Sequence, residues 1–114
     1  MERLKILLDN NVIDKETFDF MVVVFKKLTS KYKLTEPSIE MIVTHLAMAT
    51  QRIKSGQTIN PLNEEIIKEV ETENLYPQAL EIYEDLLSAS RVVFPQSEKV
   101  FIVTHLLNLI KEGD

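Results

Sequence analysis

The two histidines of the chain, His45 and His105, stand in the same five-residue phrase, Ile-Val-Thr-His-Leu. The phrase begins at residues 42 and 102, so its two copies lie 60 residues apart. A neutral imidazole nitrogen is a nucleophile whose charge state is easily biased near neutral pH, which suits it to phosphoryl transfer. The copies are too far apart for a ligand pair on one helix, so only the fold could bring the two rings together.

Each histidine has a charged residue seven positions away, but in opposite directions along the chain. Arg52 follows His45 by seven residues, and Glu98 precedes His105 by seven residues. On a helix, residues seven apart share one face. If the two helices pack antiparallel with the histidines facing each other, Arg52 comes opposite Glu98, about 10 Å further along the axis. One geometry would then satisfy two polar pairs.

Composition indicates one folded domain of 114 residues, with 45% hydrophobic and 27% charged residues. The net charge of -5 has the wrong sign for direct binding to a phosphate backbone. The chain has no cysteine, which excludes disulfides and thiolate metal sites and is typical of a reducing compartment, so we expect a cytoplasmic protein. We expect no membrane span, since no apolar stretch approaches the required length of about 18 residues.

Periodic apolar residues and a shortage of glycine favour an all-α fold. The helices are predicted at about residues 2–9, 15–28, 36–54, 61–72, 77–92 and 94–112. Asp14, Thr35 and Asn60 are the predicted N-caps, and Pro37 and Pro61 are placed in first turns. The basic stretch at the end of the second helix is interpreted as charge that complements the negative end of a helix dipole.

Apolar positions at helical spacing define the expected core. The residues predicted to face it are Phe18, Met21, Val22, Phe25 and Leu28, then Ile39, Ile42, Val43, Leu46 and Ile53, and finally Leu80, Tyr83, Leu86 and Leu87. The last helix is apolar on almost every side, which predicts a place in the middle of a helical bundle.

Three stretches carry a family resemblance: THLAMATQRIKSGQTINPL, YPQALEIYEDL and FPQSEKVFIVTHLLN. Their pattern is His-Leu, an arginine seven residues after the histidine, Asn-Pro, Tyr-Pro opening a helix, then a glutamate seven residues before a second His-Leu. This ordered set resembles the PTS regulation domain (PRD) of bacterial sugar-utilisation regulators, over about residues 15–112. The resemblance implies a compact bundle of five main helices that pairs into homodimers.

The resemblance also implies a function. It makes His45 and His105 phosphoryl acceptors, supplied by the phosphocarrier protein or a sugar-permease component, with Arg52 and Glu98 as supporting residues. We therefore expect a non-enzymatic module of transcriptional regulation without a cofactor, organised as a single domain over residues 1–114. Residues 1–13 would be an N-terminal extension and 15–112 the core. Regulators of this family commonly carry two such domains behind a nucleic-acid-binding module, whereas this sequence shows one copy.

Two other interpretations remain open at the level of sequence. The first is a metal-dependent enzyme whose site combines His45, His105 and Glu98, two imidazoles and one carboxylate. The second is a purely structural dimerisation domain, because a histidine at the edge of an apolar stripe is often a satisfied packing residue.

Overall fold

Every regular element that the structure describes is helical. The computed structural model describes residues 2–34, 36–57 and 63–113. The elements are α1 (Glu2–Asp9), α2 (Lys15–Lys26), a π-helical turn η1 (Lys27–Lys31), α3 (Glu36–Lys54), α4 (Glu64–Glu71), α5 (Tyr76–Leu87) and α6 (Gln96–Gly113). The all-α prediction is confirmed, with five main helices after the short α1. The predicted cap residues Thr35 and Asn60 lie outside the described residues, as does Pro61.

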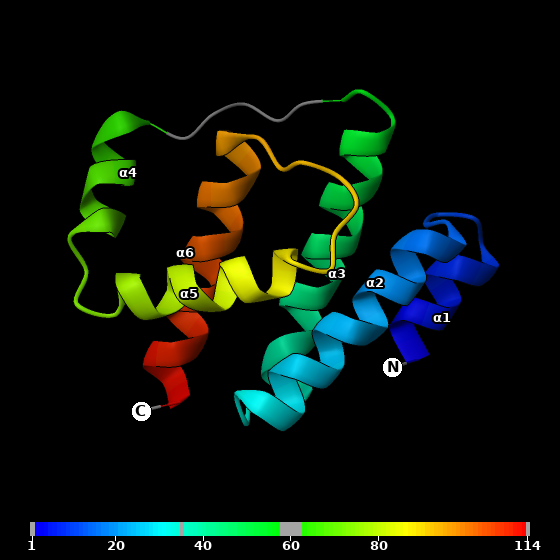
Figure 1. The fold of residues 1–114 in the computed structure, drawn as a ribbon, viewed down its shortest axis with the longest axis horizontal. Helices are drawn as coiled ribbons and strands as arrows, with labels where there is room; N and C mark the ends of the chain where they lie inside the picture. The colour runs from blue at the N-terminus through cyan, green and yellow to red at the C-terminus, as the bar shows by residue number, and fades with distance from the viewer. Residues whose placement is uncertain (1, 35, 58–62, 114) are drawn as a thin grey trace.

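The two histidine-bearing helices, α3 and α6, pack against each other and run in opposite directions (Figure 1). α5 packs on α6, α2 packs on the opposite side of α3, and α1 packs on α2. α6 thus packs against two helices, α3 and α5, which agrees with its apolar character on several sides. The predicted antiparallel arrangement is confirmed, and it is the feature of the fold that the candidate site depends on.

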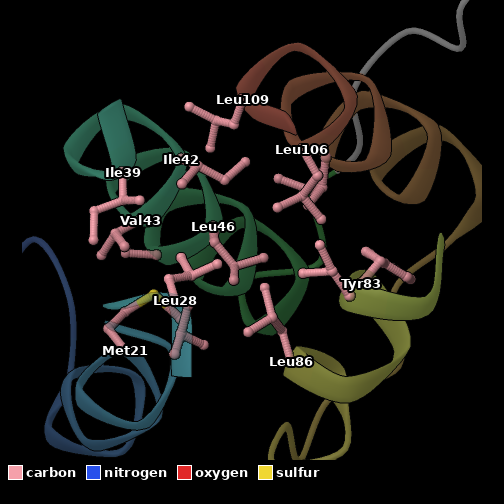
Figure 2. Packing of buried hydrophobic residues seen from close by; sticks show 14 of the residues in the cluster. Met21, Leu28, Ile39, Ile42, Val43, Leu46, Tyr83, Leu86, Leu106 and Leu109 are labelled. Atoms are coloured by element: carbon pink, nitrogen blue, oxygen red, sulfur yellow. The ribbon is translucent and has the colours of Figure 1, made fainter. Parts of the chain in front are cut away.

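The core lies between α2, α3, α5 and α6 (Figure 2). Leu46 of α3 is fully buried near its centre, with apolar side chains from all three other helices around it. The labelled neighbours include Met21 from α2, Leu28 from η1, Leu86 from α5 and Leu106 from α6. Burial of side chains this large contributes about 1.5–3 kcal/mol each, so this layer holds α3 and α6 together.

α2 begins where the sequence predicts, because the side chain of Asp14 accepts a hydrogen bond from the backbone N–H of Thr17 at 2.8 Å. Its buried face differs from the prediction. The buried positions of α2 are Thr17, Phe20, Met21 and Val24, and Leu28 is buried in η1. Phe18, Val22 and Phe25, which were predicted to point inward, are only half-buried.

A polar contact explains this rotation of α2. The hydroxyl of Thr17 donates a hydrogen bond to Oε1 of Gln51 on α3 at 2.7 Å, and the backbone N–H of Asp14 donates to the same oxygen at 3.0 Å. Thr17 is therefore buried with its hydroxyl satisfied, and the helix turns that side towards α3. A pattern of apolar residues does not identify a buried threonine, so the prediction of the buried face of α2 was wrong.

Two lysines of η1, which follows α2, form a tertiary contact that the dipole interpretation did not include. Lys27 Nζ lies 3.1 Å from Oδ1 of Asp85 on α5, and Lys31 Nζ lies 2.8 Å from Oδ2. The hydroxyl of Tyr32 donates to the same carboxylate. Lys31, then Tyr32 and Lys27, hold the pKa of Asp85 well below its usual range. The cluster ties η1 to α5.

Replacing Asp85 with alanine is expected to lower the free energy of unfolding at neutral pH by about 1 kcal/mol, because these pairs are partly solvent-exposed. A carboxyl with a lowered folded-state pKa stabilises the fold above its unfolded pKa of about 3.9 and loses that contribution as the pH falls. Urea unfolding should therefore show a difference from wild type that shrinks below about pH 4. Glu81→Ala, at an exposed position of α5, is the control, and an equal effect there would contradict the assignment.

The ends of three helices are set by local hydrogen bonds. α3 closes at Gly56, whose φ of +76° suits glycine, with the N–H of Gln57 donating to the carbonyl of Arg52 at 2.9 Å. α4 begins at Glu64, where Asn63 is the cap, and the predicted start at residue 61 lies outside the described residues. α5 ends at Leu87 instead of residue 92, since serine hydroxyls at residues 88 and 90 bond nearby carbonyls in place of the helical pattern.

Candidate functional site

His45 of α3 and His105 of α6 lie face to face. Their ring centroids are 4.6 Å apart and their planes are inclined by 27°, a stacked arrangement. The ring of Phe101, one turn before His105, packs against both imidazoles, at 5.4 Å from His45 and 4.8 Å from His105. The structure thus brings together the two histidines that the sequence predicts to meet.

The repeated phrase produces the same local environment twice. In residues 42–46 and 102–106 the isoleucine, valine and leucine are buried in the core. Each threonine hydroxyl donates to the carbonyl four residues earlier, at 2.8 Å in both copies. Because the apolar members take the inner face, each histidine stands at the edge of the stripe and is half-buried. The rings therefore meet at the boundary between core and solvent.

Arg52 and Glu98 form a bidentate ion pair across α3 and α6, seven residues from His45 and His105 respectively. Arg52 Nε lies 3.1 Å from Oε2 of Glu98, and Nη2 lies 3.0 Å from Oε1. The Glu98 side chain is 1% exposed and that of Arg52 is 28% exposed. Paired hydrogen bonds of this kind fix orientation as well as charge. The predicted alignment of these two residues across α3 and α6 is confirmed.

Two aromatic residues of the site were not assigned to it by sequence reasoning. Phe101 lies four residues before His105, which places both on one helix face, so the spacing carried a signal. Tyr83 of α5 was predicted only as a core residue. Burial, with a smaller effect from the charge of Glu98, raises the pKa of Tyr83 to about 12. Tyr83 therefore remains neutral beside the buried carboxylate at physiological pH.

Residues 8–109, nearly the whole chain, match the family model of the PRD domain. The chain belongs to the PRD domain family. PRD domains are regulatory, and the helical architecture described above is that of this family.

Two relatives of this PRD protein are uncharacterized proteins of bacteria. A Haemophilus influenzae protein is 26% identical over 76 residues, which are 67% of this chain and 61% of the relative. The Escherichia coli protein YhfY is 27% identical over 109 residues, covering 94% of this chain and 91% of the relative. No solved structure matches the chain. None of the helices that the structure describes is long and apolar enough to cross a membrane.

The imidazole of His105 in this PRD is biased towards its neutral form. Burial lowers the pKa of His105, and the nearby His45 lowers it further by charge repulsion. Phe101 covers part of the ring and supplies no charge that could favour the imidazolium. At neutral pH a nitrogen lone pair of His105 is therefore available for chemistry.

The pKa shift of His105 predicts a pH-dependent stability. The folded state binds fewer protons than the unfolded state between the two pKa values, so stability falls as the pH drops below about 6.5. The urea midpoint of the wild type should decrease between about pH 7.5 and 5.5 more steeply than that of His105→Gln, which cannot titrate at this position. Parallel curves for the two proteins would contradict the assignment.

The metal-site interpretation lacks a complete ligand set in this PRD. Across residues 2–34, 36–57 and 63–113, no three His, Cys, Asp or Glu side chains are placed to hold a metal ion. Glu98 is bound to Arg52, and it lies seven residues from His105 along α6. The two imidazoles therefore have no carboxylate between them.

Two clefts of the PRD lie away from the histidines. One of about 440 Å³ is lined by α2 and by residues 89–92 near Thr50. The other, of about 220 Å³, lies between α4, the start of α5 and α6. Among the described lining residues, neither cleft includes His45, His105, Arg52 or Glu98. The histidine pair is therefore part of a helix surface and does not line either of these clefts.

Proposed function

We propose that this PRD is a regulatory module of the bacterial sugar phosphotransferase system, with His45 and His105 as its phosphoryl acceptors. The observation that carries the proposal is the stacked imidazole pair, with the Arg52–Glu98 ion pair two helical turns away across the same two helices. Membership of the PRD family supports the regulatory role. The phosphoryl donor is the phosphocarrier protein or a sugar-permease component.

The chemistry requires a neutral imidazole that a donor protein can reach. Both histidines are partly open to solvent, and burial favours the neutral form of His105. A ring nitrogen attacks phosphorus with its lone pair; the new N–P bond forms as the bond to the donor breaks, and the donor keeps that electron pair. Because the histidines lie on helices at the surface, a protein donor fits the site better than a small molecule.

The output is a change in packing at the α3–α6 surface. A phosphoryl group adds about two negative charges, which compete with Glu98 for the guanidinium of Arg52. Loss of that partner leaves Glu98 buried and unpaired, a costly arrangement that favours repacking. Met41, which is 60% exposed, lies one turn from His45, so an exposed apolar side chain adjoins the charge that changes.

Such a surface suits control through protein association. We propose that the module works as a cytoplasmic homodimer, or through a partner protein, in transcriptional regulation, without a cofactor and without contacting nucleic acid itself. It would act as one PRD unit, in which residues 1–13 extend a core of residues 15–112. α1 of the extension is anchored to the core through the buried side chain of Leu4.

Reconstitution tests this function. The protein is incubated with phosphoenolpyruvate, the first phosphotransferase enzyme and the phosphocarrier protein, with and without permease components, and acid-labile phosphate is mapped by mass spectrometry. We expect phosphate on His45 or His105, and none on the double variant His45→Gln/His105→Gln. Sedimentation of the labelled and unlabelled forms then reports whether association changes. Absence of label with every donor would contradict the proposal.

A structural dimerisation domain is the second candidate, favoured by the close packing of Phe101 with both imidazoles. In that case the histidines are packing residues with no acceptor role. The same reconstitution separates the two candidates, since this one predicts a stable dimer that takes no phosphate and whose association is unaffected by the donor proteins.

A further inference from the structure

We infer that the histidine pair accepts one phosphoryl group at a time, so that modification of either His45 or His105 bars the other. The inference rests on the proposed function for the identity of the biological donor. The limit of one phosphoryl group per pair rests on the geometry of the two rings. The site would then carry at most one phosphoryl group per chain although it contains two acceptor histidines.

The stacked geometry places both acceptor nitrogens in nearly parallel planes. The lone pair of an imidazole nitrogen lies in the plane of its ring, and the two planes are inclined by only 27° with centroids 4.6 Å apart. A phosphoryl group is thicker than an aromatic ring, so a group on one ring crowds the edge of the other. Neither lone pair points at the other ring, so direct transfer between the two is not expected without ring rotation.

Charge limits the pair as well as space. On α3 and α6, the polar residues three, four or seven positions from either histidine whose side chains the structure describes are Arg52, Glu98 and Asn108. Arg52 is the one cation in this set, and it is already bound to Glu98. A first phosphate can draw on Arg52. A second would meet the first phosphate and the Glu98 carboxylate with no further cation of this set to balance it.

The consequence is a site with three states: unmodified, phosphorylated on His45, or phosphorylated on His105. Two donors that prefer different histidines would therefore compete at this PRD. Their signals could not add, since occupancy of one ring excludes the other. The two histidines of the repeated sequence would thus make the PRD respond to one phosphoryl donor or the other, and not to both at once.

Chemical phosphorylation tests the limit without any phosphotransferase protein. Potassium phosphoramidate transfers its phosphoryl group to imidazole nitrogen as its own P–N bond breaks and ammonia leaves. The full chain is treated exhaustively under native conditions and in concentrated urea, and phosphate is counted on the intact protein by mass spectrometry. We expect one phosphate per folded chain, distributed between the two histidines, and two per unfolded chain.

Single variants show whether the limit comes from exclusion or from one inaccessible ring. His45→Gln and His105→Gln, each checked for folding by circular dichroism, should both take one phosphate in the native state. Two phosphates on the folded wild type would overturn the inference, as would none, or a folded single variant that takes none. If phosphoramidate yields the single phosphate while the reconstituted donors yield no label, the proposed function fails and the limit of one stands.

Discussion

Replacing Arg52 with alanine is expected to lower the free energy of unfolding by about 3 kcal/mol, near the low end of what breaking a buried ion pair costs. Both hydrogen bonds from the guanidinium end on Glu98, whose side chain is 1% exposed. Without them the carboxylate stays in the core with its main partner gone. The 28% exposure of Arg52 allows water to replace some of the loss, which keeps the value from the upper end. Urea unfolding at neutral pH measures it.

The controls for Arg52 separate a buried pair from a surface charge. Arg91→Ala removes an arginine that is 82% exposed and 3.9 Å from its nearest carboxylate, so its effect should be within about 0.5 kcal/mol. The double variant Arg52→Met/Glu98→Leu should recover most of the stability, because it removes both charges and keeps the volume. An Arg52→Ala protein as stable as Arg91→Ala would contradict the buried pair.

Shortening the leucine after each histidine is expected to cost about 2–5 kcal/mol. Leu46 and Leu106 are fully buried and belong to the layer that joins α3 to α6. Leu46→Ala and Leu106→Ala each leave a cavity in packed surroundings, and the loss of contacts adds to the lost transfer free energy. The equilibrium unfolding midpoint should fall accordingly in both variants.

Met41→Ala is the matched control for these two leucines. It truncates a large apolar side chain on α3 at a position that is 60% exposed, so the expected change is within about 0.5 kcal/mol. Similar losses at residues 41 and 46 would mean that the packing between α3 and α6 is not what stabilises the pair of helices.

The register of the site was predictable because helical geometry is periodic. Residues seven apart share a face, so the opposite offsets of Arg52 and Glu98 could be satisfied together only by antiparallel helices with stacked histidines. Both contacts occur in the structure. Which ring accepts a phosphoryl group, and from which donor, stays a prediction, since such a transfer depends on a partner surface outside this chain.

Contacts between elements distant in sequence were not predictable in the same way. The rotation of α2 follows from the bond between Thr17 and Gln51, a polar contact that hydrophobic periodicity does not encode. The binding of Lys27 and Lys31 to Asp85 depends on how η1 meets α5, across more than 50 residues of chain. Each was missed because a polar side chain found its partner only after the helices had packed.

By itself, the sequence determined the helical class, most helix boundaries and the face of each helix on which the histidines stand, because caps, breakers and apolar spacing act within a few residues. Tertiary structure alone decided the 4.6 Å separation of the imidazoles, the cover supplied by Phe101 and the near-complete burial of Glu98. These depend on how closely α3, α5 and α6 approach, and that distance is set by the volumes of core side chains from all three helices together.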